Sequence, residues 1–328
     1  MYRRTPSKRP PRRRRKRVAA TGVPKEGMRR VPPVTFVGGT GRSGTHVVSR
    51  LLASHGKLDL IPVECRFHVE RRGFPGLLAG TTTKRQFIRR LRGFWWRGFQ
   101  TNRMRGMYRF VPRERFEGAV EAFDESFDDD PEDACRELFW DLLWPAEAEG
   151  EVSGIVEQSC DTVAQAPVLH RLFPHAAFVH VVRDGRDASA SRVSQTRGLI
   201  RPRTREQGLA WWEERLREMD AGARAVPSGQ LAQVSLDELL ADPGAQMLEE
   251  LFRVVRLRPG RRVQGFLANR MSPEEANAER WRKGISERKR ERLDAVYAQA
   301  LERLADEGIG AAPLLRRTYE RRRAARQT

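Results

Sequence analysis

Hydrophobic positions along this chain form two kinds of run, and the two kinds alternate. Short continuous apolar runs, such as those at 34–37 and 178–182, predict buried β-strands. Stretches with apolar residues three and four positions apart, such as 46–52, predict helices that bury one face. Further strands are expected at 57–64, 152–157 and 231–234, and further helices at 162–173, near Asp187, and at 205–225, 236–256 and 286–306.

Strands that alternate with helices predict an α/β fold, namely a three-layer sandwich around a mostly parallel sheet. The folded domain is expected to span residues 34–315, because Arg and Pro dominate residues 1–33 and Arg dominates residues 316–328. Within it, residues 66–150 predict a helical region with aromatic clusters and an acidic run.

The formal net charge of +19 lies mostly in the two flanking segments. Residues 1–17 hold ten Lys or Arg and no acid, and residues 316–328 hold six Arg and one Glu. We therefore predict a disordered basic N-terminal arm and a solvated, mobile basic C-terminal tail. The body is near neutral, so no specific nucleic-acid partner is expected, only weak contacts of the tails with RNA, DNA or anionic lipid.

The cellular setting follows from what the sequence lacks. It has no apolar run of 18 residues or more, so no membrane-spanning helix is expected. No apolar run follows the basic N-terminus, which favours a cytoplasmic protein over a secreted one. Cys65, Cys135 and Cys160 are far apart and form no C-x-x-C pair, so neither a disulfide framework nor a structural metal site is predicted.

The first predicted strand leads into a glycine-rich turn and then into a helix. The turn reads Gly38-Gly39-Thr40-Gly41-Arg42-Ser43-Gly44-Thr45. Backbone N–H groups of such a turn, together with the positive end of the helix, bind a phosphate-like anion. A nucleotide triphosphatase would carry Lys where Thr45 stands, whereas the cation here is Arg42, inside the turn.

Another interpretation of this turn stays open at this point. A dinucleotide-binding fingerprint can be drawn through Gly39, Gly41 and Gly44, with Glu64 as its acidic residue.

Two segments resemble the sulfotransferases that use 3′-phosphoadenosine 5′-phosphosulfate (PAPS). Arg42-Ser43-Gly44-Thr45 resembles the loop that binds the 5′-phosphosulfate in that family. Residues 179–191 resemble its 3′-phosphate motif: an apolar strand, Arg183 at the strand end, an Arg-Asp-Gly turn, and Ser191 eight residues after Arg183. An Arg at a strand end offers two parallel donors to a phosphate, and Ser191 can donate its hydroxyl to the same group.

The C-terminal half is similar to the same family. Residues 234–243 follow its pattern of a strand, Tyr-Glu-Asp-Leu and Asp-Pro, with Leu236 in place of the Tyr. Residues 280–286 look like the family's cofactor-closing loop, and the resemblance as a whole covers residues 34–310. By that resemblance, the residues that lie over the adenine and the 3′-phosphate are Trp281, Arg282, Lys283 and Gly284.

The resemblance implies a P-loop-containing nucleotide-binding fold of the sulfotransferase type. It also implies transfer of a sulfuryl group from PAPS to a hydroxyl, with 3′-phosphoadenosine 5′-phosphate (PAP) as the product. Besides the closing loop, the expected cofactor-binding residues are Arg42, Ser43, Gly44, Thr45, His46, Arg183 and Ser191. No metal is expected, because the strand at 178–182 ends in Arg183 where a nucleotide triphosphatase places an Asp for magnesium.

Two residues are expected to carry the chemistry. Arg42 would stabilise the leaving phosphate. Glu64 is the predicted base, because Glu64-Cys65-Arg66 stands at the offset where tyrosylprotein-type sulfotransferases have a Glu-x-Arg with a Glu base. A salt-bridged Glu64 is one alternative, and His68 as the base is another, since cytosolic sulfotransferases use a His.

Two positions depart from the family's pattern. Gln158 stands where many relatives carry a Lys, and Gln195 stands where tyrosylprotein-type enzymes have an Arg. Arg192 or Arg197 could supply the second of these charges. Transition-state stabilisation would then depend more strongly on Arg42.

Residues 66–150 are expected to form the acceptor side. Four tryptophans there either stack on a sugar or aryl ring or belong to the core; they are Trp95, Trp96, Trp140 and Trp144. Five arginines either favour an acidic acceptor or form a solvated helix face; they are Arg71, Arg72, Arg89, Arg90 and Arg92.

The acceptor itself stays open between a carbohydrate, a small molecule and a protein tyrosine. Two other functions are weighed beside sulfuryl transfer. One is a P-loop nucleotide kinase or phosphotransferase, and the other is a nucleotide-sensing nucleic-acid-binding protein.

Overall fold

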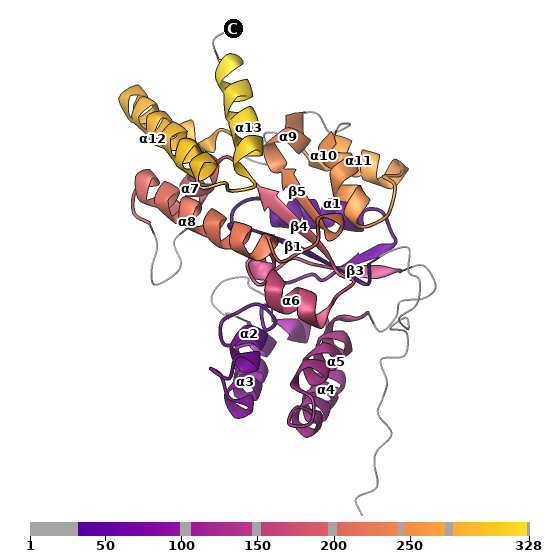
Figure 1. The fold of residues 1–328 in the computed structure, drawn as a ribbon. Helices are drawn as coiled ribbons and strands as arrows, with labels where there is room; N and C mark the ends of the chain where they lie inside the picture. The colour runs from indigo at the N-terminus through magenta and orange to yellow at the C-terminus, as the bar shows by residue number, and fades with distance from the viewer. Residues whose placement is uncertain are drawn as a thin grey trace, which may run out of the picture.

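The computed structural model describes residues 32–98, 106–145, 152–195, 202–241, 246–272 and 278–326 (Figure 1). Within these residues five strands form one sheet, in the order β2-β3-β1-β4-β5, and all neighbouring strands are parallel. The strands are β1 (Val34–Gly39), β2 (Leu58–Leu60), β3 (Gly154–Glu157), β4 (Ala177–Val182) and β5 (Leu231–Ser235). The predicted α/β fold is confirmed, although β2 is shorter than the run at 57–64 suggested.

The central strand β1 positions the glycine-rich turn. Phe36 pairs with Glu157 of β3 on one side, and Gly39 pairs with Val181 of β4 on the other. The carboxyl ends of parallel strands meet at one edge of the sheet, which is where α/β proteins form their ligand crevice. The turn after Gly39 and the turn after Val182 therefore leave the sheet side by side.

Alternate strand residues enter two separate cores, because successive side chains point to opposite faces of a sheet. Val37 and Val179 belong to the first core, whereas Phe36 and Phe178 belong to the second. Burial on both faces explains why the strands appear in the sequence as continuous apolar runs.

Helices cover both faces and complete the three layers, with α1 and α6 on opposite sides of the sheet in Figure 1. The helices of the first core are α1 (Thr45–Ala53), α7 (Gly185–Val193), α8 (Arg205–Ala223), α9 (Leu236–Ala241), α10 (Gln246–Val254), α11 (Arg261–Arg270), α12 (Glu287–Asp306) and α13 (Ala312–Ala324). Those of the second are α2 (Phe74–Leu78), α3 (Lys84–Arg90), α4 (Arg113–Ser126), α5 (Pro131–Leu143) and α6 (Ala166–Leu172). None of the described helices has the length and apolar character that crossing a bilayer requires.

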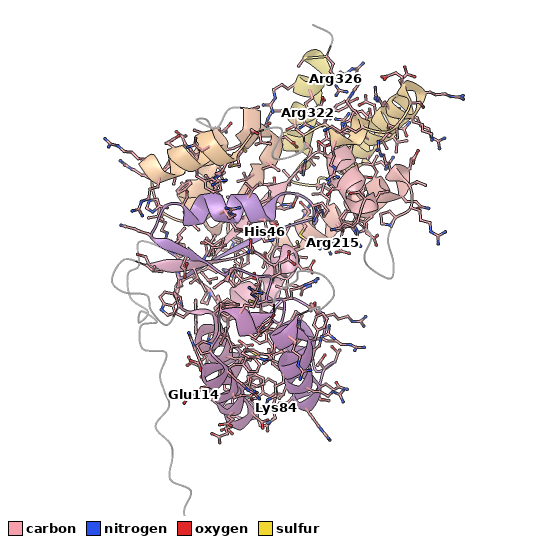
Figure 2. The ribbon with its side chains drawn as sticks, turned by 180° about the vertical axis from the view of Figure 1, so that it is seen from behind. His46, Lys84, Glu114, Arg215, Arg322 and Arg326 are labelled. Atoms are coloured by element: carbon pink, nitrogen blue, oxygen red, sulfur yellow. The ribbon has the colours of Figure 1, made fainter. Side chains whose placement is uncertain are left out.

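The region at 66–150 is helical where it is described, and its tryptophans are core residues. Trp95 and Trp144 are buried, Trp96 packs on Phe116, and Trp140 packs edge-on against Phe173. These contacts decide against rings that stack on an acceptor. The helices of this region form a lobe at one end of the molecule. In Figure 2, Lys84 and Glu114 of this lobe lie far from Arg322, and His46 lies between them.

The segment at 316–326 is not a mobile tail, so this part of the sequence-based prediction is wrong. It belongs largely to α13, which buries Leu315 and Thr318. Tyr319 lies edge-on to Tyr297 of α12, with ring centroids 5.7 Å apart. A count of basic residues predicts a solvated segment, but the apolar face of α13 packs on the domain and Arg322 pairs with buried acids. The predicted N-terminal arm lies outside the described residues, except for residues 32 and 33.

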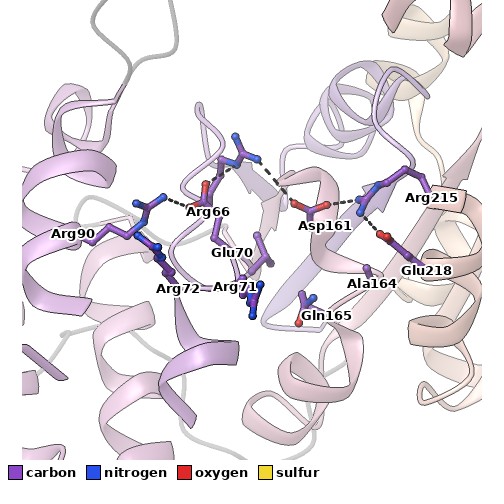
Figure 3. Close-up of a pocket in the computed structure, with 11 residues that line it drawn as sticks. Arg66, Glu70, Arg71, Arg72, Arg90, Asp161, Ala164, Gln165, Arg215 and Glu218 are labelled. Atoms are coloured by element: carbon purple, nitrogen blue, oxygen red, sulfur yellow. Dashed lines mark hydrogen bonds and ion pairs between the residues drawn. The ribbon is translucent and has the colours of Figure 1, made fainter. Parts of the chain in front are cut away.

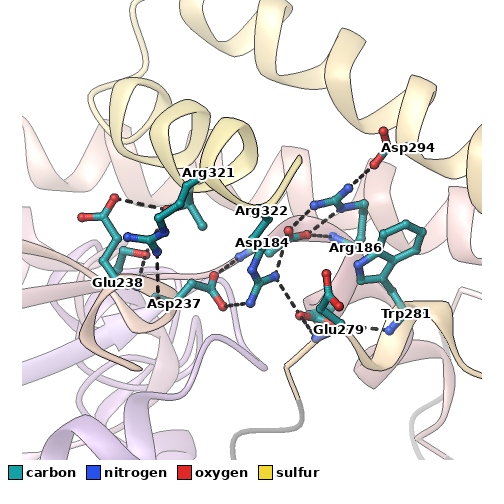
Figure 4. Close-up of polar contacts among 12 residues, drawn as sticks. Asp184, Arg186, Asp237, Glu238, Glu279, Trp281, Asp294, Arg321 and Arg322 are labelled. Atoms are coloured by element: carbon teal, nitrogen blue, oxygen red, sulfur yellow. Dashed lines mark hydrogen bonds and ion pairs between the residues drawn. The ribbon is translucent and has the colours of Figure 1, made fainter. Parts of the chain in front are cut away.

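Arg322 of α13 links three buried carboxylates (Figure 4). Its Nη1 lies 3.1 Å from Asp184 and 3.2 Å from Asp187, and its Nη2 lies 2.8 Å from Asp237. Asp184 pairs with Arg186 as well. Burial alone would raise the pKa of Asp184, but the adjacent Arg186 lowers that pKa below its ordinary value, so Asp184 stays charged. Removal of either arginine leaves buried negative charge without compensation.

The Arg322→Ala variant tests this network. Breaking a buried ion pair by removing one partner costs about 3–5 kcal/mol, and we expect a loss of that size in the free energy of unfolding, measured by urea denaturation. Arg323→Ala, at the exposed neighbouring position, is the control and should change the free energy by less than about 0.5 kcal/mol. Equal urea midpoints for the two variants would contradict the proposed role of Arg322.

Candidate functional site

The turn between β1 and α1 presents backbone N–H groups to one place. Gly41, Arg42 and Gly44 have φ values of 83°, 62° and 97°, and such left-handed residues curve a backbone so that successive N–H groups converge. No side chain caps the N-terminus of α1, and no described residue accepts a hydrogen bond from the N–H of Ser43 or Gly44. Ser43 is buried, and its Oγ has no partner among the described residues. Together these donors suit an anion.

Both glycines at the end of β1 are required by close contacts. A Cβ on Gly38 would lie 2.5 Å from Oγ1 of Thr162, and a Cβ on Gly39 would lie 2.5 Å from the carbonyl oxygen of Val181. Gly44 faces Leu236, whose Cδ2 would be 2.6 Å from an added Cβ. Leu236, which stands where the resemblance places a Tyr, therefore packs against the turn.

The second motif lies in contact with this turn, although the two are about 140 residues apart. Arg42 donates from Nε to Oγ of Ser191 over 2.9 Å, across a separation of 149 residues. Arg183 donates from Nη1 to the carbonyl oxygen of Arg42 over 3.4 Å. Arg183 follows β4 directly, and Ser191 lies on α7, whose N-terminus Asp184 caps through the N–H of Arg186. The strand ends thus bring both predicted anion-binding segments together.

A third arginine, absent from the predicted site residues, completes the group. Arg280 donates from Nη1 to Oγ of Ser191 over 3.4 Å, and from Nη2 to Oγ of Ser194 over 3.3 Å. We call Arg42, Arg183, Arg280 and Ser191 the arginine cluster. Partial burial, together with the nearby positive charges of Arg280 and Arg183, lowers the pKa of Arg42. Mutual repulsion of this kind is relieved when an anion binds between the guanidinium groups.

The loop around Arg280 is held by Asp187. The carboxylate of Asp187 accepts from the N–H of Glu279 over 2.9 Å and from the N–H of Trp281 over 3.2 Å. Arg322 pairs with the same carboxylate. Helix α13 therefore supports the loop that carries Arg280 (Figure 4).

The four loop residues expected over the cofactor lie apart from the arginine cluster. Trp281 is 1% exposed, and its ring packs against the guanidinium of Arg186. The carbonyl oxygens of Arg282 and Lys283 accept from Arg290 and Arg205. In the described part of the chain, no contact joins the side chain of Arg282 or Lys283, or Gly284, to the cluster. Arg280, one residue earlier than this set, is the residue that the structure brings in.

Glu64 lies next to the glycine-rich turn. Cys160, which follows β3, donates from Sγ to Oε1 of Glu64 over 3.5 Å. Burial raises the pKa of the Glu64 carboxyl, while the nearby Arg66 and His46 act in the opposite direction. Glu64 in turn tends to raise the pKa of Arg42, so the two side chains lie close enough for their charges to interact. His46 is exposed on the first turn of α1.

His68 is not placed to act as a base. It is completely buried, its Nε2 lies 3.0 Å from Oε2 of the equally buried Glu157, and its ring packs against Phe67 and Phe139. A general base has to reach the proton of the acceptor, and a side chain enclosed in the core does not. Glu157 therefore belongs to the core, whereas Glu64 lies next to the glycine-rich turn.

The two glutamines that depart from the family's pattern have local partners. Gln158 is buried and donates to the carbonyl oxygen of Ile61 over 2.9 Å, which ties β3 to the segment after β2. Gln195 accepts from Arg192 over 2.8 Å. Arg197, the other candidate for that charge, lies outside the described residues. The described residues contain no group of three or more His, Cys, Asp or Glu side chains that could hold a metal ion.

Gly39→Ala tests the steric origin of the turn. Its Cβ would meet Oγ of Ser43 and the carbonyl oxygen of Val181, so we expect a loss of about 1–3 kcal/mol in the free energy of unfolding. Gly118→Ala is the matched control, because no atom lies within 4 Å of its Cβ on α4. That variant should gain about 0.5–1 kcal/mol from helix propensity. Urea denaturation measures the change in the free energy of unfolding for both variants. Changes of the same sign in the two variants would contradict this packing.

Known proteins resemble this chain in sequence and in fold. A family model described as "Sulfotransferase family" matches residues 33–257. The sulfotransferase domain from the curacin biosynthetic pathway aligns with a TM-score of 0.51 at 14% identity, over 84% of this chain and 99% of that one. This likeness concerns the fold alone.

Two further solved structures are similar at lower TM-scores. The sulfotransferase domain of the Synechococcus olefin synthase aligns with a TM-score of 0.46 at 16% identity, over 86% of this chain and 98% of that one. Sulfotransferase STF1 from Mycobacterium tuberculosis aligns with 0.45 at 17% identity, over 85% and 78%. A comparison with curated proteins found no match. Because the family model covers well over half of the sequence, the chain belongs to the sulfotransferase family.

Proposed function

We propose that this sulfotransferase uses PAPS as its donor and transfers the sulfuryl group to a hydroxyl of its acceptor, with Glu64 as the base. The observation that carries the proposal is the contact between the two anion-binding segments. Arg42 and Ser191 lie 2.9 Å apart, and Arg183 reaches the backbone of Arg42. One small molecule with anionic groups at both ends of a nucleoside would span such a site.

The residues present fit that donor. The free N–H groups of Ser43 and Gly44, the uncapped N-terminus of α1 and the unpartnered Oγ of Ser43 suit the 5′-phosphosulfate. Arg183 and Ser191 suit the 3′-phosphate, and Arg280 adds a third guanidinium there. We assign Arg280 to this group although its side chain was not among the sequence-based candidates.

The chemistry then divides among a few side chains. PAPS supplies an activated sulfuryl group on a phosphate leaving group. Glu64 takes the proton of the acceptor hydroxyl while the acceptor oxygen bonds to sulfur. Arg42 and the N–H groups of the turn stabilise the negative charge that appears on the phosphate as its S–O bond breaks. A sulfuryl group carries less negative charge than a phosphoryl group, so guanidinium groups suffice for this role.

PAP binding tests the donor assignment. At about 100 times its Kd, PAP should stabilise the folded protein by about 2.7 kcal/mol, which thermal denaturation in the presence of a metal chelator measures. Arg183→Ala should weaken PAP binding by about tenfold or more, since a charge-assisted hydrogen bond is lost. Arg89→Ala, at an exposed position on α3, is the control and should bind PAP as the unchanged protein does.

The same assay separates the alternatives. Stabilisation by ATP with magnesium but not by PAP would indicate a kinase, and stabilisation by NAD would indicate a dinucleotide site. Removal of residues 1–33 should leave PAP binding intact. Loss of PAP binding on that truncation would favour a nucleic-acid-linked function of the basic arm.

Glu64→Gln tests the base. Isotope-labelled PAPS and a cell extract would first identify an acceptor, and kcat for transfer to it should then fall by about 10²–10⁴ in the variant. Transfer requires the deprotonated carboxylate, so kcat should rise with pH, with a midpoint above the ordinary Glu value of about 4.3 because burial raises the pKa of Glu64.

The Glu64→Gln variant should lose this rising limb and still bind PAP. Asp59→Asn, an exposed carboxylate on β2, is the control and should retain both kcat and the pH profile. An unchanged kcat in Glu64→Gln would assign the base elsewhere.

A further inference from the structure

A charged pocket of about 370 Å³ lies beside the segment that follows the proposed base, and Arg66 of that segment lines it (Figure 3). The segment that carries Glu64 continues into its wall at Arg66, and Cys160, which donates to Glu64, is followed by Asp161 in the facing wall. Arg90 of α3 and Arg215 of α8 close its sides. Two chain segments thus connect the lining of the pocket with Glu64, and the volume of the pocket falls within the range of small-molecule sites.

The charges that line the pocket do not cancel. Arg90 lies 2.8 Å from Glu70, Arg66 lies 3.3 Å from Glu70 and 4.0 Å from Asp161, and Arg215 pairs with Asp161 and Glu218. This alternating chain of charges crosses the pocket in Figure 3 and uses all three of its carboxylates.

Two lining arginines are left over. Arg71 and Arg72 have no carboxylate partner among the described residues, so the pocket keeps two positive charges. Arg66 adds a further sign of a ligand site, because it holds a left-handed backbone conformation with φ 63°. Non-glycine residues in that region cluster at binding sites. Its N–H is held by Oγ of Ser159 over 3.2 Å.

The lining also discriminates between types of acceptor. Val69 and Ala164 are the apolar members of the lining, and no aromatic residue lines the pocket among the residues described. Arginines, carboxylates and the amide of Gln165 offer hydrogen bonds throughout. An aryl acceptor would find few apolar side chains to pack against here, whereas a polyhydroxylated molecule would exchange one set of hydrogen bonds for another.

We infer that this pocket binds the acceptor, and that the acceptor is a small polyhydroxylated molecule with an anionic group, such as a uronate or a sugar phosphate. The anionic group contacts Arg71 and Arg72 while a hydroxyl faces Glu64. This inference rests on the proposed function and names the substrate class for that site.

The test uses the full chain saturated with PAP, which occupies the arginine cluster and leaves the pocket as the anion site to be probed. Calorimetric titrations compare glucuronate, glucose-6-phosphate, glucose and para-nitrophenol. At least one of the anionic sugars should bind about tenfold more tightly than glucose and para-nitrophenol, and the two anionic sugars separate a carboxylate from a phosphate as the preferred group.

Two double variants locate the effect. Arg71→Gln with Arg72→Gln should weaken binding of the preferred anionic sugar by about tenfold and leave PAP binding unchanged. Arg85→Gln with Arg89→Gln, on the exposed face of α3 outside the pocket, removes the same charge and should leave both affinities unchanged.

Each other outcome is decisive. Equal binding of glucose and both anionic sugars, tighter binding of para-nitrophenol, or equal weakening by the two double variants would overturn the inference. PAP binding, measured first in the same titrations, keeps the two hypotheses apart. If PAP fails to bind, the proposed function is wrong and the acceptor assignment falls with it. If PAP binds and no anionic sugar is preferred, the acceptor assignment alone is wrong.

Discussion

The parallel pairing of β1 with β4 is the constraint on which the site depends. Because Gly39 lies opposite Val181, two turns distant in sequence emerge at the same point of the sheet edge. Small residues make this possible, since the backbone of the first turn approaches the carbonyl oxygen of Val181 too closely for a Cβ at Gly39. The contacts between Arg42, Ser191 and Arg183 follow from that register rather than from any affinity of the side chains for one another, because two of the three carry the same charge.

The short turn after β4 serves the anion site and its support at once. Arg183 contacts the backbone of the glycine-rich turn at Arg42, whereas Asp184 and Asp187, a few residues later, pair with Arg186 and Arg322. These buried ion pairs hold the turn in place, and a rigid support of this kind is what a preorganised anion site requires.

The sequence pattern predicted well those structural features that depend on residues close together along the chain. Strand runs, the glycine-rich turn and the strand-end Arg183 all lie where their periodicity and order indicated. Features that depend on contacts between segments distant in sequence could not be predicted from the sequence pattern. The enclosure of His68 with Glu157 and the choice of Arg280 over Trp281 depend on which side chains face each other after folding. The same is true of residues 316–328, most of which belong to α13. Six arginines in thirteen residues predict a solvated segment, and only the folded structure shows that Arg322 pairs with buried acids.

The distance in sequence between Asp184 and Arg322 also affects how the protein is made. The turn at 183–187 leaves the ribosome well before Arg322, which follows Asp184 by 138 residues. During that interval Arg322, which compensates the charge of the three buried carboxylates, has not yet been synthesised. The first core therefore stays incomplete while its strands already exist. Nascent chains that stall within this interval would expose the apolar face prepared for α13, which makes them natural clients for chaperones that bind apolar surfaces.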